Sequence, residues 1–101
     1  MEPDFGKSTG FDWDAGNSSK SVNKHRVTTR EAEEAFSDPS LKVLDAPGHS
    51  AAELRWKAFG KTHAGRMLVV SFTVRGSLVR VISARPMNRK ERGIYEQEAT
   101  A

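Results

Sequence analysis

The C-terminal part of the sequence groups side chains that could cleave an RNA phosphodiester without a metal ion. These side chains are Arg80, Arg85, Glu91, Arg92 and Tyr95. Such cleavage removes the proton of the 2′-OH, stabilises the extra negative charge on the phosphoryl oxygens and protonates the leaving 5′ oxygen. Arginine meets the charge requirement, and glutamate or tyrosine can move the protons. Glu91 and Tyr95 stand at i and i+4, which places them on one face of a helix.

Lys24 and His25 form a second pair of candidates, because lysine can stabilise a phosphate and histidine can act as an acid or a base near neutral pH. Each candidate also has an ordinary structural explanation. The arginines could be solvated surface charges, Glu91 could cap a helix, Tyr95 could dock that helix on a sheet and His25 could belong to a turn. The candidate catalytic residues are Lys24, His25, Arg80, Arg85, Glu91 and Tyr95.

The charges are distributed unevenly along the chain. Residues 1–50 contain nine acidic and six basic side chains, whereas residues 51–101 contain four acidic and ten basic ones. So many cations cannot be buried unpaired in a small core, because each would cost several kcal/mol (order of magnitude). They must lie on a surface, which is either an ordinary solvated face or a surface that binds phosphates. The candidate RNA-binding residues are Arg55, Lys57, Arg66, Arg75, Arg89 and Arg92.

Composition and motifs exclude several other classes of protein. The 101 residues contain no cysteine, so a disulfide scaffold, a thiolate metal site and a cysteine nucleophile are excluded. His25, His49 and His63 lie in three different segments, which disfavours a metal site, and we expect no cofactor. The sequence has neither a glycine-rich phosphate loop nor a nucleophile elbow. It also lacks a long apolar run, so we expect no membrane span and a cytoplasmic protein.

The sequence pattern predicts one α+β domain over residues 11–97, with tails at residues 1–10 and 98–101. The helices and strands of this domain must position the candidate residues. A short extended piece at Phe11–Trp13 should pair at a sheet edge, and a weak helix should span Ala15–His25. The next helix should begin at a capping box, Thr28-x-x-Glu31, and end at Asp38-Pro39. A connector should then run through Pro47-Gly48.

Three strands and a last helix should follow. The predicted strands are residues 53–59, 67–75 and 78–84, and the predicted helix is Arg89–Gln97. The order β-α-α-β-β-β-α then contains an antiparallel meander. Strict alternation along the third of these strands would place Arg80 and Arg85 on opposite faces. Both could reach one groove only if Arg85 had already left the strand.

Taken together, these segments resemble the BrnT family, the toxins of the BrnT/BrnA type II toxin–antitoxin system. The resemblance covers about residues 11–97, and its most specific part is the junction between the last strand and the last helix. The matching segments are Phe11-Asp12-Trp13-Asp14, Lys24-His25-Arg26-Val27, Asp38-Pro39, Arg55-Trp56, Gly65-Arg66-Met67-Leu68-Val69-Val70, Arg80-Val81-Ile82-Ser83-Ala84-Arg85 and Glu91-Arg92-x-x-Tyr95.

The resemblance implies a RelE-like fold and a metal-independent endoribonuclease that inhibits translation and is neutralised by a cognate antitoxin. That antitoxin would resemble the ribbon-helix-helix protein BrnA, would assemble with the toxin in a two-plus-two complex, and would alone contact DNA. On this interpretation Arg80 and Arg85 contact the scissile phosphate with help from Lys24. His25 or Glu91 takes the 2′-OH proton, and Tyr95 orients the substrate or the leaving group.

Three positions differ from the family pattern, which has Lys, Asn and Gly where this chain has Asn17, Ser21 and Arg26. Replacing the glycine removes easy access to a positive φ at that turn. These differences leave open an alternative function, a catalytically weak or inactive homologue that binds an antitoxin or RNA. A generic basic nucleic-acid-binding domain is a third possibility, with an affinity that falls steeply with salt and no cleavage product.

Overall fold

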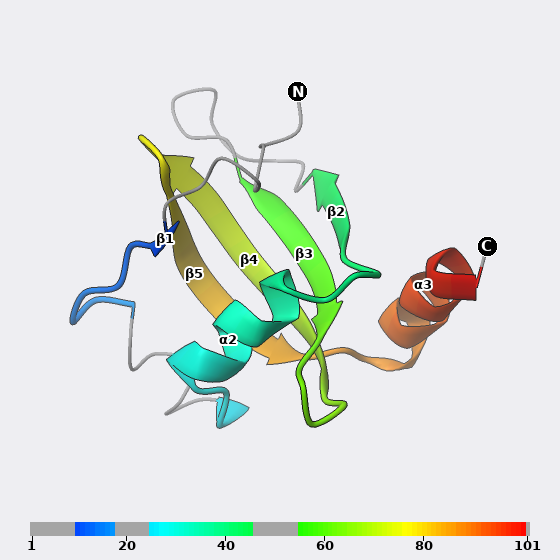
Figure 1. Cartoon of the computed structure of the whole chain (residues 1–101). Helices are drawn as coiled ribbons and strands as arrows, with labels where there is room; N and C mark the ends of the chain where they lie inside the picture. Colours follow the sequence, from blue (N-terminus) through cyan, green and yellow to red (C-terminus); the bar gives the residue numbers. More distant parts are fainter. Residues whose placement is uncertain (1–9, 18–24, 46–54, 101) are drawn as a thin grey trace.

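A five-stranded mixed sheet with two helices forms the fold of the computed structural model, which describes residues 10–17, 25–45 and 55–100 (Figure 1). The strand order is β1-β5-β4-β3-β2, with β1 parallel to β5 and the other neighbours antiparallel. The elements are β1 (Gly10–Phe11), α2 (Thr29–Phe36), β2 (Lys42–Asp45), β3 (Trp56–Lys61), β4 (Met67–Arg75), β5 (Leu78–Pro86) and α3 (Arg89–Thr100).

The predicted α+β class and the antiparallel meander, now β3-β4-β5, are confirmed. One difference is β2, which pairs with β3 where the sequence predicted only a connector. Its four residues are too few to show a period on their own. Residues 15–17 of the predicted first helix form a turn, and residues 18–24, including Ser21 and Lys24, lie outside the described residues.

Helix α2 begins directly after its predicted N-cap, Thr28, and ends at Phe36, just before the predicted Asp38-Pro39 stop. Thr28 Oγ1 accepts a hydrogen bond from Glu31 N at 3.1 Å, and Glu31 Oε1 accepts one from Thr28 N at 3.0 Å, so the capping box is complete. Ala32 and Ala35 are buried against the sheet. Gly60 of β3 allows this close approach, because a Cβ there would lie 2.2 Å from the carbonyl oxygen of Ala35. Small side chains on both elements therefore set the distance between α2 and the sheet.

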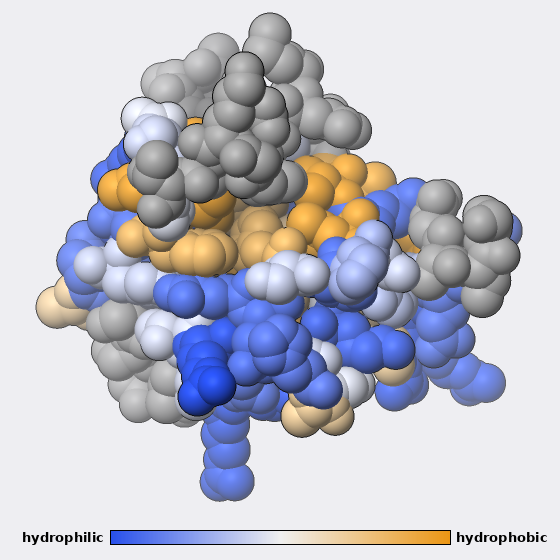
Figure 2. Space-filling view, viewed as in Figure 1, coloured by the Kyte–Doolittle hydropathy of each residue, from blue (hydrophilic) through white to orange (hydrophobic). Residues whose placement is uncertain are grey.

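The two faces of the sheet differ in what covers them. Helix α2 crosses the face that is turned toward the viewer in Figure 1. The largest buried side chains of this first face include Phe72, Leu68 and Val79, and apolar groups form a band above α2 in Figure 2. On the opposite, second face, a smaller cluster joins α3 to one end of the sheet; it comprises Phe59, Val69, Met87 and Tyr95.

Candidate nucleic-acid interface

The cluster of Phe59, Val69, Met87 and Tyr95, which we call the α3 cluster, covers one part of the second face. The rest of that face carries polar and cationic side chains, and we call it the polar face. Directly paired residues of an antiparallel sheet project on the same side. Lys57 pairs with Ser71, which pairs with Ser83, and these residues occupy the row next to Phe59 and Val69 of the α3 cluster. The polar face consists of Lys57, Ser71, Thr73, Arg80, Ser83 and Arg85.

Arg80 and Arg85 both project from the polar face, which corrects the alternation predicted from the sequence. Val81 pairs with Phe72 and Ser83 pairs with Ser71, so Ile82 has no partner on β4 and forms a bulge. The extra residue reverses the alternation beyond it. As a result, Arg80 stands opposite Thr73 and Arg85 stands opposite Val69, on one side of the sheet. Arg85 is still within β5, so it does not need to leave the strand.

Glu91 holds Arg85 by a two-point ion pair. Arg85 Nη1 donates to Glu91 Oε1 at 2.6 Å, and Nη2 donates to Oε2 at 2.7 Å. Glu91 is placed there by the first turn of α3, where its backbone N–H donates to Asn88 Oδ1 at 2.8 Å and its Oε1 accepts from Asn88 N at 2.9 Å. The hydrogen bonds from Arg85 lower the pKa of Glu91 below its ordinary value. Glu91 is therefore a weak base, better suited to orienting Arg85 than to taking a proton.

Arg80 is held in a similar way at the other side of the polar face. Its Nη1 and Nη2 donate to Asp14 Oδ2 and Oδ1 at 2.9 and 3.3 Å, and its Nη1 also lies 3.5 Å from Asp12 Oδ2. The hydrogen bonds from Arg80 lower the pKa of Asp14. Buried Asn17 fixes this turn, because its Nδ2 donates to the carbonyls of Asp12 and Val81 and its Oδ1 accepts from Asp14 N.

Both guanidinium groups keep one edge directed away from their carboxylates. Arg85 donates from Nη1 to Glu91 and to the carbonyl of Pro86, and from Nη2 to Glu91. Within the described part of the chain, its Nε and the adjacent Nη2 hydrogen donate to no acceptor. Arg80 likewise uses Nη1 and Nη2 for its carboxylates. The side-on edge of a guanidinium, formed by Nε and Nη2, matches two oxygens of a phosphate. Each arginine can therefore bind a phosphate with this edge while its carboxylate holds the end-on edge, formed by Nη1 and Nη2.

Tyr95 lies away from the polar face. It is 3% exposed in the α3 cluster, and its hydroxyl donates to Asp38 Oδ2 at 2.5 Å. Burial and this hydrogen bond raise the pKa of Tyr95 to about 12. The structure thus gives Tyr95 the docking contact that the sequence offered as its ordinary explanation.

The turn after His25 is braced by Arg66. Arg66 Nη2 donates to the carbonyl of His25 at 3.1 Å, Nη1 donates to that of Arg26 at 2.8 Å, and Nη1 also lies 3.2 Å from Glu31 Oε2. Arg26 adopts a φ of 55°, the conformation for which the family pattern has glycine. The chain therefore keeps this turn despite the substitution, and Arg66 supports the backbone that carries His25.

The other predicted RNA-binding cations are spread over the molecule. Arg55 immediately precedes β3, and Arg75 is exposed where β4 turns into β5. Arg89 and Arg92 are exposed in the first turns of α3, next to the Arg85–Glu91 pair. Lys57 belongs to the polar face and lies close enough to Glu91 to contribute to its lowered pKa. The structure thus places Lys57, Arg80 and Arg85 on one face of the sheet and Arg66 at the His25 turn.

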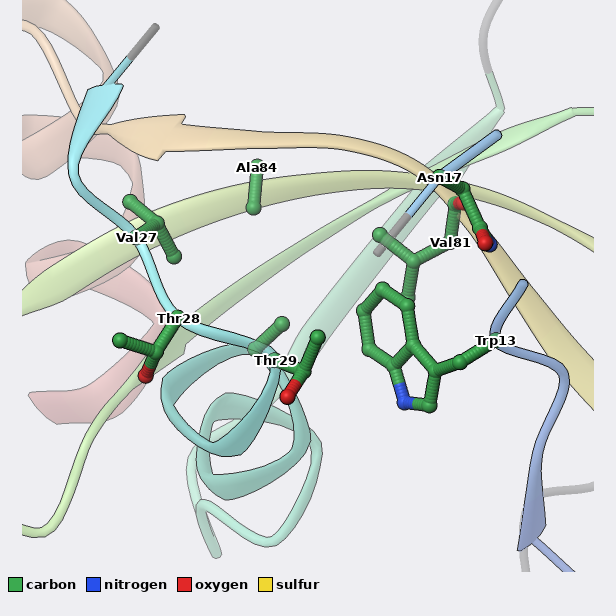
Figure 3. Close-up of a pocket in the computed structure, with 8 residues that line it drawn as sticks. Trp13, Asn17, Val27, Thr28, Thr29, Val81 and Ala84 are labelled. Atoms are coloured by element: carbon green, nitrogen blue, oxygen red, sulfur yellow. The ribbon is translucent and has the colours of Figure 1, made fainter. Parts of the chain in front are cut away.

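A small pocket on the first face is mostly apolar and is separate from the polar face. Figure 3 shows Trp13, Val27, Val81 and Ala84 around it, and Thr28 and Thr29 also line it, with their hydroxyls directed away. The residues that the structure describes contain no group of three His, Asp or Glu side chains that could hold a metal ion. Those residues also include no helix long and apolar enough to cross a membrane.

Sequence reasoning missed Asp14 and Asp38 as partners of Arg80 and Tyr95. In the sequence, Asp14 stands out only as part of the Phe11-Asp12-Trp13-Asp14 segment, and Asp38 only as part of the helix-ending Asp38-Pro39 pair. The acidic residues of Phe11-Asp12-Trp13-Asp14 and the Asp38-Pro39 pair belong to the same pattern as Arg80 and Tyr95. That shared pattern was the available signal, but it does not indicate which residues touch.

Comparisons with known proteins give one family and one fold. The family model described as the ribonuclease toxin BrnT of type II toxin–antitoxin systems matches residues 13–91. The crystal structure of the Brucella abortus ribonuclease toxin BrnT is similar in fold, with a TM-score of 0.59, 24% sequence identity, and coverage of 81% of this chain and 100% of that one. No match was found among curated proteins.

The family match confirms the resemblance seen in the sequence, and it does not favour the alternative of a non-catalytic binding module. The matched residues begin at Trp13 and end at Glu91, so they include the turn that holds Arg80 and the carboxylate that holds Arg85. This chain belongs to the BrnT family of ribonuclease toxins of type II toxin–antitoxin systems.

Proposed function

We propose that the polar face is the surface on which this toxin binds and cleaves RNA. The observation that carries the proposal is that Arg80 and Arg85 project from one face, each held by a carboxylate with its side-on edge left to bind phosphate. Their partners on β4, Thr73 and Val69, are four positions apart, so their Cα atoms are separated by about 13 Å. We therefore assign Arg85 to the scissile phosphate and Arg80 to a neighbouring phosphate.

Cleavage on this surface follows the chemistry of RNA itself. The 2′ oxygen attacks the phosphorus, the bond to the 5′ oxygen breaks, and the products are a 2′,3′-cyclic phosphate and a 5′ hydroxyl. Arg85 stabilises the negative charge that develops on the phosphoryl oxygens, and this step requires no metal ion. One group takes the 2′ proton and another supplies a proton to the 5′ oxygen.

We assign the proton transfer to His25, with Lys24 assisting at the phosphate. Val27, two residues after His25, lines the first-face pocket together with Ala84, which precedes Arg85 in β5 but projects from the opposite side of the sheet (Figure 3). The carbonyl of His25 is bound by Arg66, which immediately precedes β4, the partner strand of Arg85. His25 is thus at the same end of the sheet as Arg85. Glu91 is the weaker candidate, because its carboxylate is already committed to Arg85.

Membership of this family implies an antitoxin partner and an RNA target. We propose that the antitoxin is a BrnA-like ribbon-helix-helix protein that covers the polar face in a two-plus-two complex in the cytoplasm and is the only subunit that contacts DNA. The cationic character of the face supports an acidic segment in the partner. Co-purification with the product of the neighbouring open reading frame tests the partner, and the mass of the complex tests the stoichiometry.

Expression in bacteria tests the RNA-cleaving surface. Wild-type toxin should arrest growth and fragment cellular RNA, and Arg85→Gln should abolish both effects. Arg30→Gln is the matched control, because Arg30 is 88% exposed on α2, which covers the opposite face. Intact RNA with the wild-type protein, or equal fragmentation with wild type and Arg85→Gln, would refute the proposal.

A further inference from the structure

Two side chains of α3, those of Tyr95 and Glu91, connect this helix to the rest of the fold. Of the α3 side chains that the structure describes, Tyr95 is the one that is buried. Ile94 is partly buried, and Gly93 gives the helix no side chain with which to pack. Glu91, in the first turn of α3, forms the two-point ion pair with Arg85 of β5. Tyr95 and Glu91 are one helical turn apart, so movement at one of them displaces the other.

Asp38 gives Tyr95 a fixed acceptor. Its Oδ2 accepts from the Tyr95 hydroxyl and from Lys61 N at 2.8 Å, and its Oδ1 accepts from Ser40 N at 3.0 Å. Two of these donors are backbone groups, at the end of β3 and just after α2. Burial alone would raise the pKa of Asp38, but the hydrogen bonds outweigh it and lower that pKa. The acceptor is therefore an ionised carboxylate tied to the body of the fold.

These contacts connect the fold to the proposed RNA surface in a continuous path. Asp38 fixes Tyr95, Tyr95 docks α3, and the first turn of α3 carries Glu91. Glu91 in turn holds the end-on edge of Arg85 at 2.6 and 2.7 Å. The side-on edge that remains for phosphate thus has an orientation set by α3. A guanidinium misplaced by about 1 Å can lose much of its catalytic effect, on the order of a hundredfold.

We propose that Tyr95 and Asp38 are positioning residues for RNA cleavage, which act by docking α3 so that Glu91 orients Arg85 toward the scissile phosphate. This inference rests on the proposed function of Arg85. It assigns to Tyr95 an indirect role, in place of the direct contact with substrate or leaving group that the sequence suggested. A direct role and an indirect role differ in whether the effect of Tyr95 depends on Arg85.

A double-mutant cycle separates the two roles. The variants are Tyr95→Phe, which keeps the ring and removes the hydroxyl, Arg85→Lys, which keeps the charge and loses the two-point pair, and the double variant. Loss of full-length messenger RNA in a bacterial translation extract gives the cleavage rate with saturating toxin. Binding of a fully 2′-O-methylated oligoribonucleotide, which lacks the attacking hydroxyl, gives the affinity. Glu33→Gln, which alters the anchor of Trp13 on the other face, is the matched control.

We expect Tyr95→Phe to lower the saturated rate about tenfold to a hundredfold while the affinity changes less than about twofold. In the Arg85→Lys background the same substitution should have no further effect on the rate. Asp38→Asn should reproduce Tyr95→Phe and decides the question if the phenylalanine variant does not fold. Glu33→Gln should leave the rate unchanged.

Three results would overturn the inference. An unchanged rate for folded Tyr95→Phe would mean that the contact only stabilises the fold. Equal losses in the wild-type and Arg85→Lys backgrounds would mean that Tyr95 acts independently of Arg85, while leaving the proposed RNA surface intact. A wild-type rate for Arg85→Lys and for Arg85→Gln would remove the proposed role of Arg85 and this inference with it.

Discussion

Arg80 and Arg85 are separated by an odd number of positions on one strand, yet they project from the same face of the sheet. The unpaired Ile82 makes this possible, because a bulge shifts the alternation of all the residues beyond it. The strand thereby presents buried Val81 and Ala84 to α2 and both arginines to the opposite face. A strand without the bulge would place one of the two guanidinium groups in the core.

The salt dependence of RNA binding should show whether the two arginines contact phosphates. For single strands, each phosphate contact contributes about 0.7 to the slope of log affinity against log salt concentration. Arg80→Gln and Arg85→Gln should each reduce the slope by about this amount, and the reductions should add. Fluorescence anisotropy with a 2′-O-methylated oligoribonucleotide measures it. Arg30→Gln should keep the wild-type slope, and an equal slope in all variants would contradict phosphate contact on the polar face.

Arg26→Gly should stabilise the protein, because Arg26 has a φ of 55°, where a side chain is strained. The gain should be about 1 kcal/mol in the free energy of unfolding, measured in urea. Gly76→Ala is the converse control, since Gly76 has a φ of 60° and no atom within 4 Å of an added Cβ. It should lose about 1 kcal/mol for the same reason. A loss of stability in Arg26→Gly would show that contacts of the arginine side chain outweigh the backbone strain.

Gly60→Ala should be strongly destabilising, because its Cβ would lie 2.2 Å from the carbonyl oxygen of Ala35 and would force α2 away from β3. We expect a loss of about 3 kcal/mol. Gly93→Ala provides the comparison, since an added Cβ there meets no atom within 4 Å and alanine favours a helix by about 1 kcal/mol. In thermal unfolding, the Tm of Gly60→Ala should fall and that of Gly93→Ala should rise relative to wild type. Similar shifts in Tm would contradict the close approach of α2.

Acid should destabilise the protein partly through Glu91. The hydrogen bonds from Arg85 hold the pKa of Glu91 below 4.5, so the unfolded chain binds more protons than the folded one as the pH falls below that value. This contribution to stability is present above pH 4.5 and is lost as the pH falls through the folded-state pKa. Glu91→Gln should therefore flatten the decline in the free energy of unfolding below pH 4.5, although Asp14, Glu31 and Asp38 still contribute. Parallel declines in both proteins would contradict it.

Local signals predicted the elements that depend on neighbouring residues. The capping box at Thr28 and Glu31 determines the start of α2, and the period-two pattern of residues 67–75 predicts the bounds of β4 without error. β2 could not be predicted in this way, because its four residues form a strand only by pairing with β3. The sequence correctly predicted that Glu91 and Tyr95 lie one turn apart on the last helix, but it did not predict that Tyr95 would bind Asp38.

The sequence by itself determined which chemical groups are present, the α+β class and the family, since these depend on residue types, short periods and ordered motifs. The tertiary structure alone decided which groups meet. Arg80 reaches Asp14 across 66 positions, Tyr95 reaches Asp38 across 57, and one bulge sets the face on which Arg85 lies. The physical reason is that such contacts follow from strand register and helix docking. Both are set by the packing of the whole core, and no short stretch of sequence contains that information.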